Sequence, residues 1–456
     1  WPLSTLGWPD ESSHDLKAFY PTDVLVTAPE ILFFWVARMI MSGYQFAGRA
    51  PFHTVLLHGT VRDTNHVKMS KSLGNGIDPL DVIRLYGADA LRWTLVSGMG
   101  LGADVILDPG DLDKSFATGR NFATKLWNIG RFLLSNLGDA PVPTLDAIAP
   151  DRLTRADAWI LARLDAAIAE CDAALGPLRP TTRDAGADGV VWRPEQRYQG
   201  MRLNEYAETA RRFVWSELAD WYLEAIKGRL AAGGDDGEVA RAVLVHAFDR
   251  ALRLLHPIVP FITESIWQRL PSRVEGALLM RAAWPTRTAL PGDHAQAFEL
   301  AREAVAALRQ VRAEYAVPPG RVVDVVAVPA SAARNGTAAD DVLRAEASVI
   351  GRLARARVSV AATAPEGAAA HAILTDGSEL VIPLAGLIDV AKECARLKAD
   401  LSGLEKQIVA LDGRLANEKF TAKAPPAVVQ AERDKVRDWT ARRDQLREKV
   451  EALCGG

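Results

Sequence analysis

Residues 68–75 read KMSKSLGN, so two lysines, two serines and a Gly-Asn pair share one short polar stretch. Lysine ammonium groups neutralise phosphate oxygens, and hydroxyls and free backbone amides donate hydrogen bonds to them. The stretch therefore favours a mobile loop that binds a triphosphate. The alternative is a solvated basic turn, because most segments rich in lysine and serine are of that kind.

The sequence before the loop predicts a sheet that would position it. Apolar runs at 24–26 and 54–58 indicate two buried strands, and the residues 33–40 between them indicate a helix. Buried strands that alternate with helices predict a parallel sheet, so we expect α/β structure here.

The residues next to the loop predict where it lies. Residues 61–63 and 67–68 fit the two arms of a hairpin, and Asp78-Pro79 fits the start of a helix. The loop would then lie just past a sheet edge and directly before a helix N-terminus, which is a position suited to phosphate.

Length and composition bound the class of protein. The chain has 456 residues, which suggests about three domains. It is 49% hydrophobic and 24% charged, and no apolar run approaches the roughly 18 residues that span a bilayer, so we expect no membrane. The formal net charge of −3 neither supports nor excludes a nucleic-acid partner. The first residue is Trp1 and no initiator methionine is present, so we expect a fragment of a longer protein.

The three cysteines are Cys171, Cys394 and Cys454, and they are widely separated. They form no C-x-x-C pair that would hold zinc or cycle as a redox dithiol. We therefore expect a reducing, cytoplasmic setting and no metal held by protein side chains.

The remainder of the chain changes character three times. Residues 109–285 carry apolar side chains at three- and four-residue spacing, which predicts a helix bundle, interrupted by an exposed insertion at 177–200. Residues 291–386 predict a small α/β unit with a helix at 298–315 and strands at 322–328, 358–361 and 380–383. From Leu387 a heptad spacing continues until Pro425-Pro426, which predicts an antiparallel pair of helices. We expect a multidomain α/β plus α fold with domains 1–108, 109–290, 291–386 and 387–456.

Several segments carry a resemblance to a known family. KMSKS resembles the signature loop of class I aminoacyl-tRNA synthetases, and the longer KMSKSLGN resembles the valine, isoleucine and leucine branch. Residues 1–9, 19–22 and 31–40 resemble the later half of a valyl-tRNA synthetase catalytic domain. Residues 203–206, 221–224 and 256–261 resemble the anticodon-binding helical bundle of that branch, and residues 415–420 with the turn at 424–425 resemble its tRNA-contacting arm.

The resemblance implies a fold and a reaction. The first domain would be the C-terminal half of a class I nucleotide-binding, Rossmann-like fold. The reaction would be valine--tRNA ligation: ATP activates L-valine to valyl-adenylate with release of pyrophosphate, and the acyl group then passes to tRNA(Val). Such chemistry depends on positioning and charge neutralisation. Mg2+ would accompany the ATP.

The resemblance also implies roles for individual residues. Lys71 would stabilise the departing pyrophosphate and Lys68 would assist it. The expected ATP-binding residues are Lys68, Met69, Ser70, Lys71, Ser72, Glu30 and His58. Glu30 occupies a place where the family often has aspartate, and a histidine satisfied within the fold is an alternative for His58. Ile31 and Trp35 would line the amino-acid pocket, with ordinary core packing as the alternative.

Two features of the family are not found in the sequence: the HIGH-like motif and the inserted editing domain. We therefore expect the chain alone to be inactive. The alternatives are a non-catalytic tRNA-binding remnant, or an isoleucyl- or leucyl-tRNA synthetase of the same branch. The final helices would also suit a dimerising coiled coil, but we favour contact with tRNA and a monomeric state.

Overall fold

The computed structural model describes residues 1–137, 141–176, 200–271, 275–288, 293–330, 339–367, 369–384, 390–417 and 426–454. The chain divides into two compact units, residues 1–295 and residues 296–456, and each is described by itself. None of the helices in these described ranges is long and apolar enough to cross a membrane.

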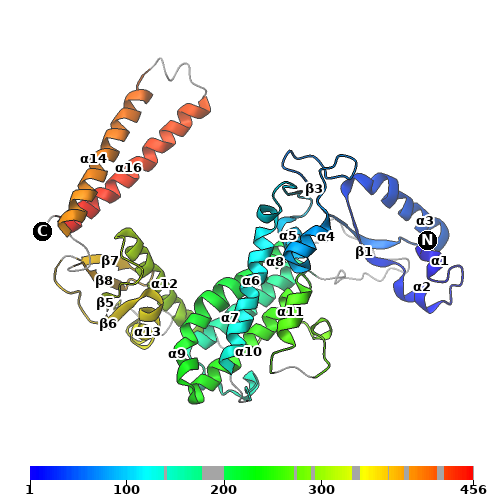
Figure 1. Cartoon of the computed structure of the whole chain (residues 1–456), viewed down its shortest axis with the longest axis horizontal. Coiled ribbons are helices and arrows are strands. Elements are labelled where there is room, and N and C mark those ends of the chain that lie inside the picture. Colours follow the sequence, from blue (N-terminus) through cyan, green and yellow to red (C-terminus); the bar gives the residue numbers. More distant parts are fainter. Residues whose placement is uncertain are drawn as a thin grey trace. The chain divides into compact units, whose positions relative to one another are not determined.

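The N-terminal region is built on a pair of parallel strands (Figure 1). Strands β1 (Thr22–Thr27) and β2 (Phe52–Leu57) pair in parallel register from Thr22 opposite Phe52 to Thr27 opposite Leu57, so both predicted strands are present. The prediction that they are buried is wrong, because most of their residues are half-buried or exposed and Val26 is 59% exposed. The connection is helical but irregular, because a 3-10 turn and a π-helical turn precede the regular helix. These elements, with two short helices before β1, are α1 (Pro2–Thr5), α2 (His14–Phe19), η1 (Pro29–Ile31), η2 (Leu32–Val36) and α3 (Ala37–Ala47).

A second parallel pair and two helices flank the KMSKS segment. They are β3 (Val61–Arg62), α4 (Pro79–Tyr86), α5 (Ala88–Gly98) and β4 (Val105–Ile106). Val82, Val105, Leu107 and Phe116 form the buried core beneath them. The Asp63 N–H donates to the Val67 carbonyl over 2.9 Å, which confirms the predicted hairpin.

The predicted bundle follows. Its elements are α6 (Leu112–Leu137), η3 (Leu145–Ala147), η4 (Pro150–Arg152), α7 (Arg155–Leu175), α8 (Leu203–Arg212), η5 (Phe213–Leu223), α9 (Glu224–Ala232), α10 (Gly234–Leu255), α11 (Pro260–Trp267) and η6 (Leu279–Arg281). Large side chains such as Trp159, Phe213, Tyr222 and Phe248 fill its core. The break before Pro260 lies where the prolines predicted it. The predicted insertion at 177–200 lies, except for Gly200, outside the described residues.

Helix α5 is fastened to the start of α11. The buried Asp89 carboxylate accepts from the backbone N–H groups of Ile262 over 2.7 Å and Phe261 over 3.3 Å. Arg92 donates to the carbonyls of Pro257 and Ile258, each over 2.8 Å. Because α5 directly follows α4, these bonds fix the segment after the loop onto the bundle.

The second unit contains a four-stranded sheet with order β6-β5-β8-β7. β5 runs parallel to β6 and antiparallel to β8, and β7 pairs antiparallel with β8. The elements are α12 (Asp293–Glu314), β5 (Val323–Val328), α13 (Ala339–Ala354), β6 (Ala356–Val360), β7 (Ala369–Ile373) and β8 (Glu379–Pro383). Strand β7 was not predicted from the sequence.

Two long helices, α14 (Val390–Leu415) and α16 (Pro426–Cys454), run side by side in opposite directions (Figure 1). Leu397, Ile408 and Leu411 of the heptad pattern are buried along their contact. Cys394 and Cys454 form a disulfide, with their Cα atoms 5.8 Å apart. The sequence analysis did not predict this disulfide, because only the antiparallel helices bring together two cysteines that are 60 positions apart.

Candidate functional site

The KMSKS loop is closed by the side chain of Asn75. Its amide nitrogen donates to the Asp63 carboxylate over 2.8 Å, and its amide oxygen accepts from the Ser70 N–H over 2.9 Å. The bond from Asn75, followed by bonds from the backbone N–H groups of Val67 and Asn65, holds the pKa of Asp63 below its usual range. Asp63 thus stays ionised and ties the hairpin turn to the far end of the loop.

The tip of the loop presents polar groups to solvent. The hydroxyls of Ser70 and Ser72 lie 3.2 Å apart, and the Leu73 N–H donates to Ser70 Oγ over 3.3 Å. Gly74 has φ +65, a left-handed conformation that glycine adopts at little cost, and so the chain can turn back toward Asn75. Lys71 is exposed and forms no ion pair with any residue in the described ranges. Its ammonium group is therefore available to an anion.

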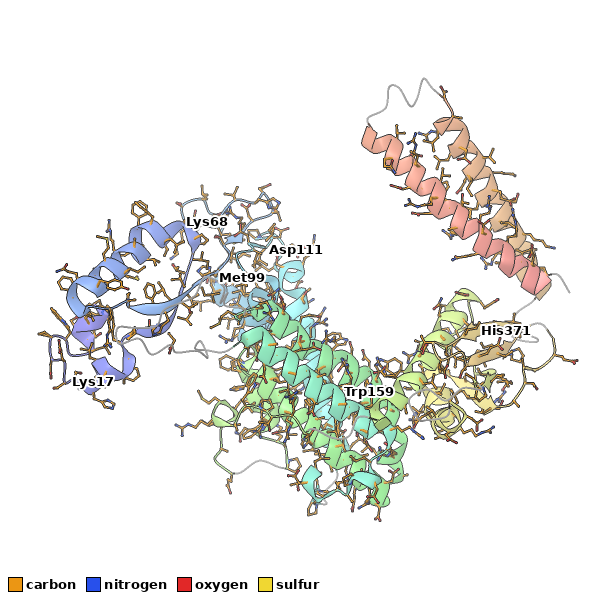
Figure 2. The ribbon with its side chains drawn as sticks, turned by 180° about the vertical axis from the view of Figure 1, so that it is seen from behind. Lys17, Lys68, Met99, Asp111, Trp159 and His371 are labelled. Atoms are coloured by element: carbon orange, nitrogen blue, oxygen red, sulfur yellow. A yellow bond between two sulfur atoms is a disulfide. The ribbon has the colours of Figure 1, made fainter. Side chains whose placement is uncertain are left out.

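Lys68 is held differently from Lys71. Figure 2 labels it on the connection that follows β3. Its ammonium group forms an ion pair with Glu30, which lies in the turn after β1. That bond is the main reason that the pKa of Glu30 lies below its usual range, and the nearby His58 lowers it slightly further. The structure therefore brings together Glu30, His58 and Lys68, three of the predicted ATP-binding residues.

His58 ends the second strand at a tight backbone contact. Its Nδ1 lies 2.7 Å from the Gly59 carbonyl oxygen. A Cβ atom on Gly59 would lie 1.7 Å from the Ala103 carbonyl oxygen, so only glycine fits there. A cavity of about 280 Å³ lies beside His58, with Val26, Leu57 and Met99 among its lining residues.

The two residues predicted for the amino-acid pocket lie in the turns after β1. Ile31 is 38% exposed and Trp35 is 56% exposed, so the alternative of ordinary core packing is not what the structure shows. Neither residue lines the cavity beside His58. Their proposed role thus remains a prediction about a surface rather than about an enclosed pocket.

A second polar surface, which the sequence did not reveal, lies on the bundle. The Lys125 ammonium group lies 5.2 Å and the Arg211 guanidinium 5.8 Å from the ring centre of Trp215. Phe122 stacks on the same ring, with centroids 6.4 Å apart. Cations combined with an aromatic ring are the groups that proteins use to hold single-stranded RNA. The three polar residues come from α6, α8 and η5, so no local pattern would have indicated the cluster.

Comparison with known proteins places each of these regions. Residues 1–108 match the family model for class I tRNA synthetases (I, L, M and V), and residues 187–327 match the anticodon-binding domain of tRNA ligase. Residues 389–454 match the valyl tRNA synthetase tRNA-binding arm. Proteins named Valine--tRNA ligase align over nearly the whole chain: that of Enterococcus faecalis is 37% identical over 459 residues, covering 99% of this chain and 48% of the relative. The chain belongs to the valyl-tRNA synthetase family.

Other members of the valyl-tRNA synthetase family give the same result. The Valine--tRNA ligase of Geobacillus kaustophilus is 38% identical, covering 99% of this chain and 48% of its own length. The protein from Mesorhizobium japonicum is 40% identical, covering 98% and 44% respectively. The chain therefore spans about half the length of the curated relatives it matches.

Solved structures of related synthetases are more distant. A methionyl-tRNA synthetase of Mycobacterium tuberculosis in complex with methionyl-adenylate matches with TM-score 0.44 and 22% identity, covering 63% of this chain and 53% of that one. The Agrobacterium radiobacter K84 agnB2 LeuRS matches with TM-score 0.43 and 20% identity, covering 59% and 29%.

Proposed function

We propose that this chain provides the phosphate-binding loop and the tRNA-binding parts of a valine--tRNA ligase. The reaction is the ATP-dependent activation of L-valine to valyl-adenylate, followed by transfer of the valyl group to tRNA(Val). The observation that carries the proposal is the exposed Lys71 ammonium group, which lies without an ion-pair partner in the described chain on a loop closed by Asn75.

The two lysines of the loop act differently in this proposal. Lys71 neutralises the charge that develops on pyrophosphate as it leaves, while the Ser70 and Ser72 hydroxyls donate to phosphate oxygens. Lys68 is paired with Glu30 before the nucleotide arrives. ATP would draw Lys68 to its phosphates, and Glu30 could then accept hydrogen bonds from the ribose hydroxyls, with His58 and the backbone of Met69 close by.

Magnesium enters with the nucleotide. The described part of the chain holds no group of three or more His, Cys, Asp or Glu side chains that could bind a metal ion. In this proposal the ion is held chiefly by phosphate oxygens and water, which is the usual manner for Mg2+. Its chemistry is charge neutralisation on the triphosphate, which adds to that of the lysines.

The rest of the proposal concerns the partners. The region that matches the anticodon-binding domain would hold tRNA through charged and aromatic groups such as Arg211 and Trp215. Lys125 of α6 lies outside that matched region and would contribute from beside the same ring. Helices α14 and α16 would form the coiled-coil arm that contacts tRNA. Ile31 and Trp35 would contact valine. We propose a monomer in the cytoplasm, with the four predicted domains 1–108, 109–290, 291–386 and 387–456.

Pyrophosphate exchange tests the proposal. The chain is assayed alone and as a chimera in which it replaces the corresponding half of the Geobacillus kaustophilus Valine--tRNA ligase. We expect exchange that depends on valine in the chimera. Lys71→Ala should lower kcat about 100- to 1,000-fold with little change in KM, which is the usual loss when one charge-stabilising group is removed. Lys17→Ala, at an exposed lysine of α2 that lies well apart from Lys68 in Figure 2, is the matched control.

The outcomes separate the alternatives. Exchange in the chimera that survives Lys71→Ala would refute the role of Lys71. Exchange with isoleucine or leucine in place of valine would assign the chain to another enzyme of the branch. A chimera without exchange, together with salt-dependent binding of tRNA(Val) by the chain alone, would point to a non-catalytic tRNA-binding protein.

A further inference from the structure

The disulfide lies at the end of the helix pair where α14 begins and α16 ends. Cys394 is in the first turns of α14, and Cys454 is the last residue of α16. Their bond closes a loop that contains the rest of both helices, with a sequence separation of 60 residues. A bond in this place holds the two free ends of the hairpin together.

The non-covalent contacts that hold α14 against α16 are only partly shielded from water. Among the described residues of the two helices, the buried apolar side chains are Leu397, Ile408, Leu411 and Val429. Further apolar side chains, such as Leu404, Trp439 and Leu446, are only half-buried. One ion pair crosses between the described parts of the helices, from Arg447 to Glu405 over 2.8 Å, and both side chains are about half exposed. Exposed ion pairs contribute little to stability, and isolated helices are marginal in water. The covalent bond therefore adds to the order of a hairpin whose described apolar contacts stay partly open to water.

We propose that Cys394 and Cys454 form a reversible thiol–disulfide switch that sets the order of the α14–α16 hairpin and thereby its affinity for RNA. Both cysteines are half-buried, so a small reagent can reach them. The affinity part of the inference rests on the function proposed above, while the switch itself does not.

The reaction that closes the switch is exchange with a low-molecular-weight disulfide such as oxidised glutathione. One cysteine thiolate attacks a sulfur of oxidised glutathione, which breaks its S–S bond and releases one glutathione thiolate. The second cysteine thiolate attacks the mixed disulfide and releases the second glutathione. The two cysteine sulfurs lose two electrons, glutathione disulfide gains them, and the two cysteine protons pass to the glutathione thiolates.

The third cysteine serves as an internal control. Cys171 is fully buried in α7, and burial raises the pKa of its thiol to about 12. The reactive species is the thiolate, so Cys171 should resist alkylation in the folded protein.

The test uses the full chain equilibrated in buffers of different glutathione ratio. Alkylation followed by peptide mass analysis reports the bond, and hydrogen exchange reports the order of α14 and α16. Binding of tRNA(Val) is measured in parallel. The variants are Cys394→Ser and Cys454→Ser, with Cys171→Ala as the matched control.

We expect one bond between Cys394 and Cys454 in oxidising buffer. Reduction of the disulfide, or either serine variant, should speed amide hydrogen exchange in both helices at least tenfold. It should also weaken tRNA binding several-fold, because an ordered hairpin loses less entropy on binding. Cys171→Ala should change neither. Bonds between separate chains, or exchange in α14 and α16 that is unaffected by reduction, would overturn the switch. Slowed exchange on oxidation with no tRNA binding in any form would instead support the switch and contradict the proposed function.

Discussion

Substitution of Asp157 tests how the bundle is held together. This carboxylate is fully buried at the start of α7. One oxygen accepts from the Tyr222 hydroxyl over 2.6 Å and from Arg229 over 2.8 Å. The other accepts from the Thr154 N–H over 3.0 Å and from its hydroxyl over 2.8 Å, which forms a capping box. One side chain thus joins α7, η5 and α9.

The expected cost follows from these contacts. Removing one partner of a buried ion pair costs about 3–5 kcal/mol, because the other charge remains buried. Arg229 keeps a second partner, Asp236, whose carboxylate lies 2.9 Å away and is 61% exposed, so we place Asp157→Ala at about 3–4 kcal/mol. Asp236→Ala removes the exposed partner of the same arginine and should cost less than about 1 kcal/mol.

Hydrogen exchange of the α7 and α9 peptides measures this difference locally. A loss of 3–4 kcal/mol should speed exchange from the sub-globally opened state by about 150- to 700-fold, and Asp236→Ala should speed it about fivefold or less. The double variant Asp157→Ala with Arg229→Met should recover much of the loss, since it leaves no unpaired charge. Equal effects of the two single variants, or no recovery in the double variant, would refute the reasoning.

Three further predictions concern the loop, the strand beneath it and the bundle. Asn75→Asp should loosen the KMSKS loop more than Asn75→Ala, because the aspartate places a second carboxylate against Asp63. The rate of proteolysis within the loop measures the loosening, and equal rates for the two variants would contradict the prediction. Gly59→Ala should destabilise the protein at the end of β2 by about 3 kcal/mol, because the new Cβ atom would overlap the Ala103 carbonyl. An unchanged midpoint of urea unfolding would contradict this tight contact. Burial, aided by nearby arginines, lowers the pKa of His246 to about 3. Since the unfolded chain binds this proton more tightly, the free energy of unfolding should fall as pH drops from about 6.5 to 3, and His246→Gln should reduce that slope in urea titrations at several pH values.

The sequence predicted elements whose signals are local. Apolar runs located β1 and β2, and Pro260 located the break between α10 and α11. Proline acts on its own turn of chain and an apolar run indicates a strand at its own position, so neither signal depends on distant residues. The hairpin before the KMSKS loop was predicted for the same reason.

The sequence did not predict features that depend on distant residues or weak patterns. Glu30 and Lys68 are 38 positions apart, and their pairing depends on how the turn after β1 lies beside the loop. Strand β7 consists mainly of alanine and histidine, which have little strand preference, and pairs because β8 offers an edge. In η5 the helix widens to π geometry, which apolar spacing cannot distinguish from an α-helix.

The bonds between α5 and α11 have a mechanical consequence. Asp89 accepts hydrogen bonds from the first amides of α11, and Arg92 donates to the carbonyls just before that helix. Helix α5 is therefore bonded to the chain on either side of the first residue of α11. Any rotation of α11 that preserved these four bonds would have to turn α5 with it, and with α5 the end of the connection that carries Lys71. A force on the start of α11 would therefore be transmitted to the KMSKS loop through a connection only a few residues long.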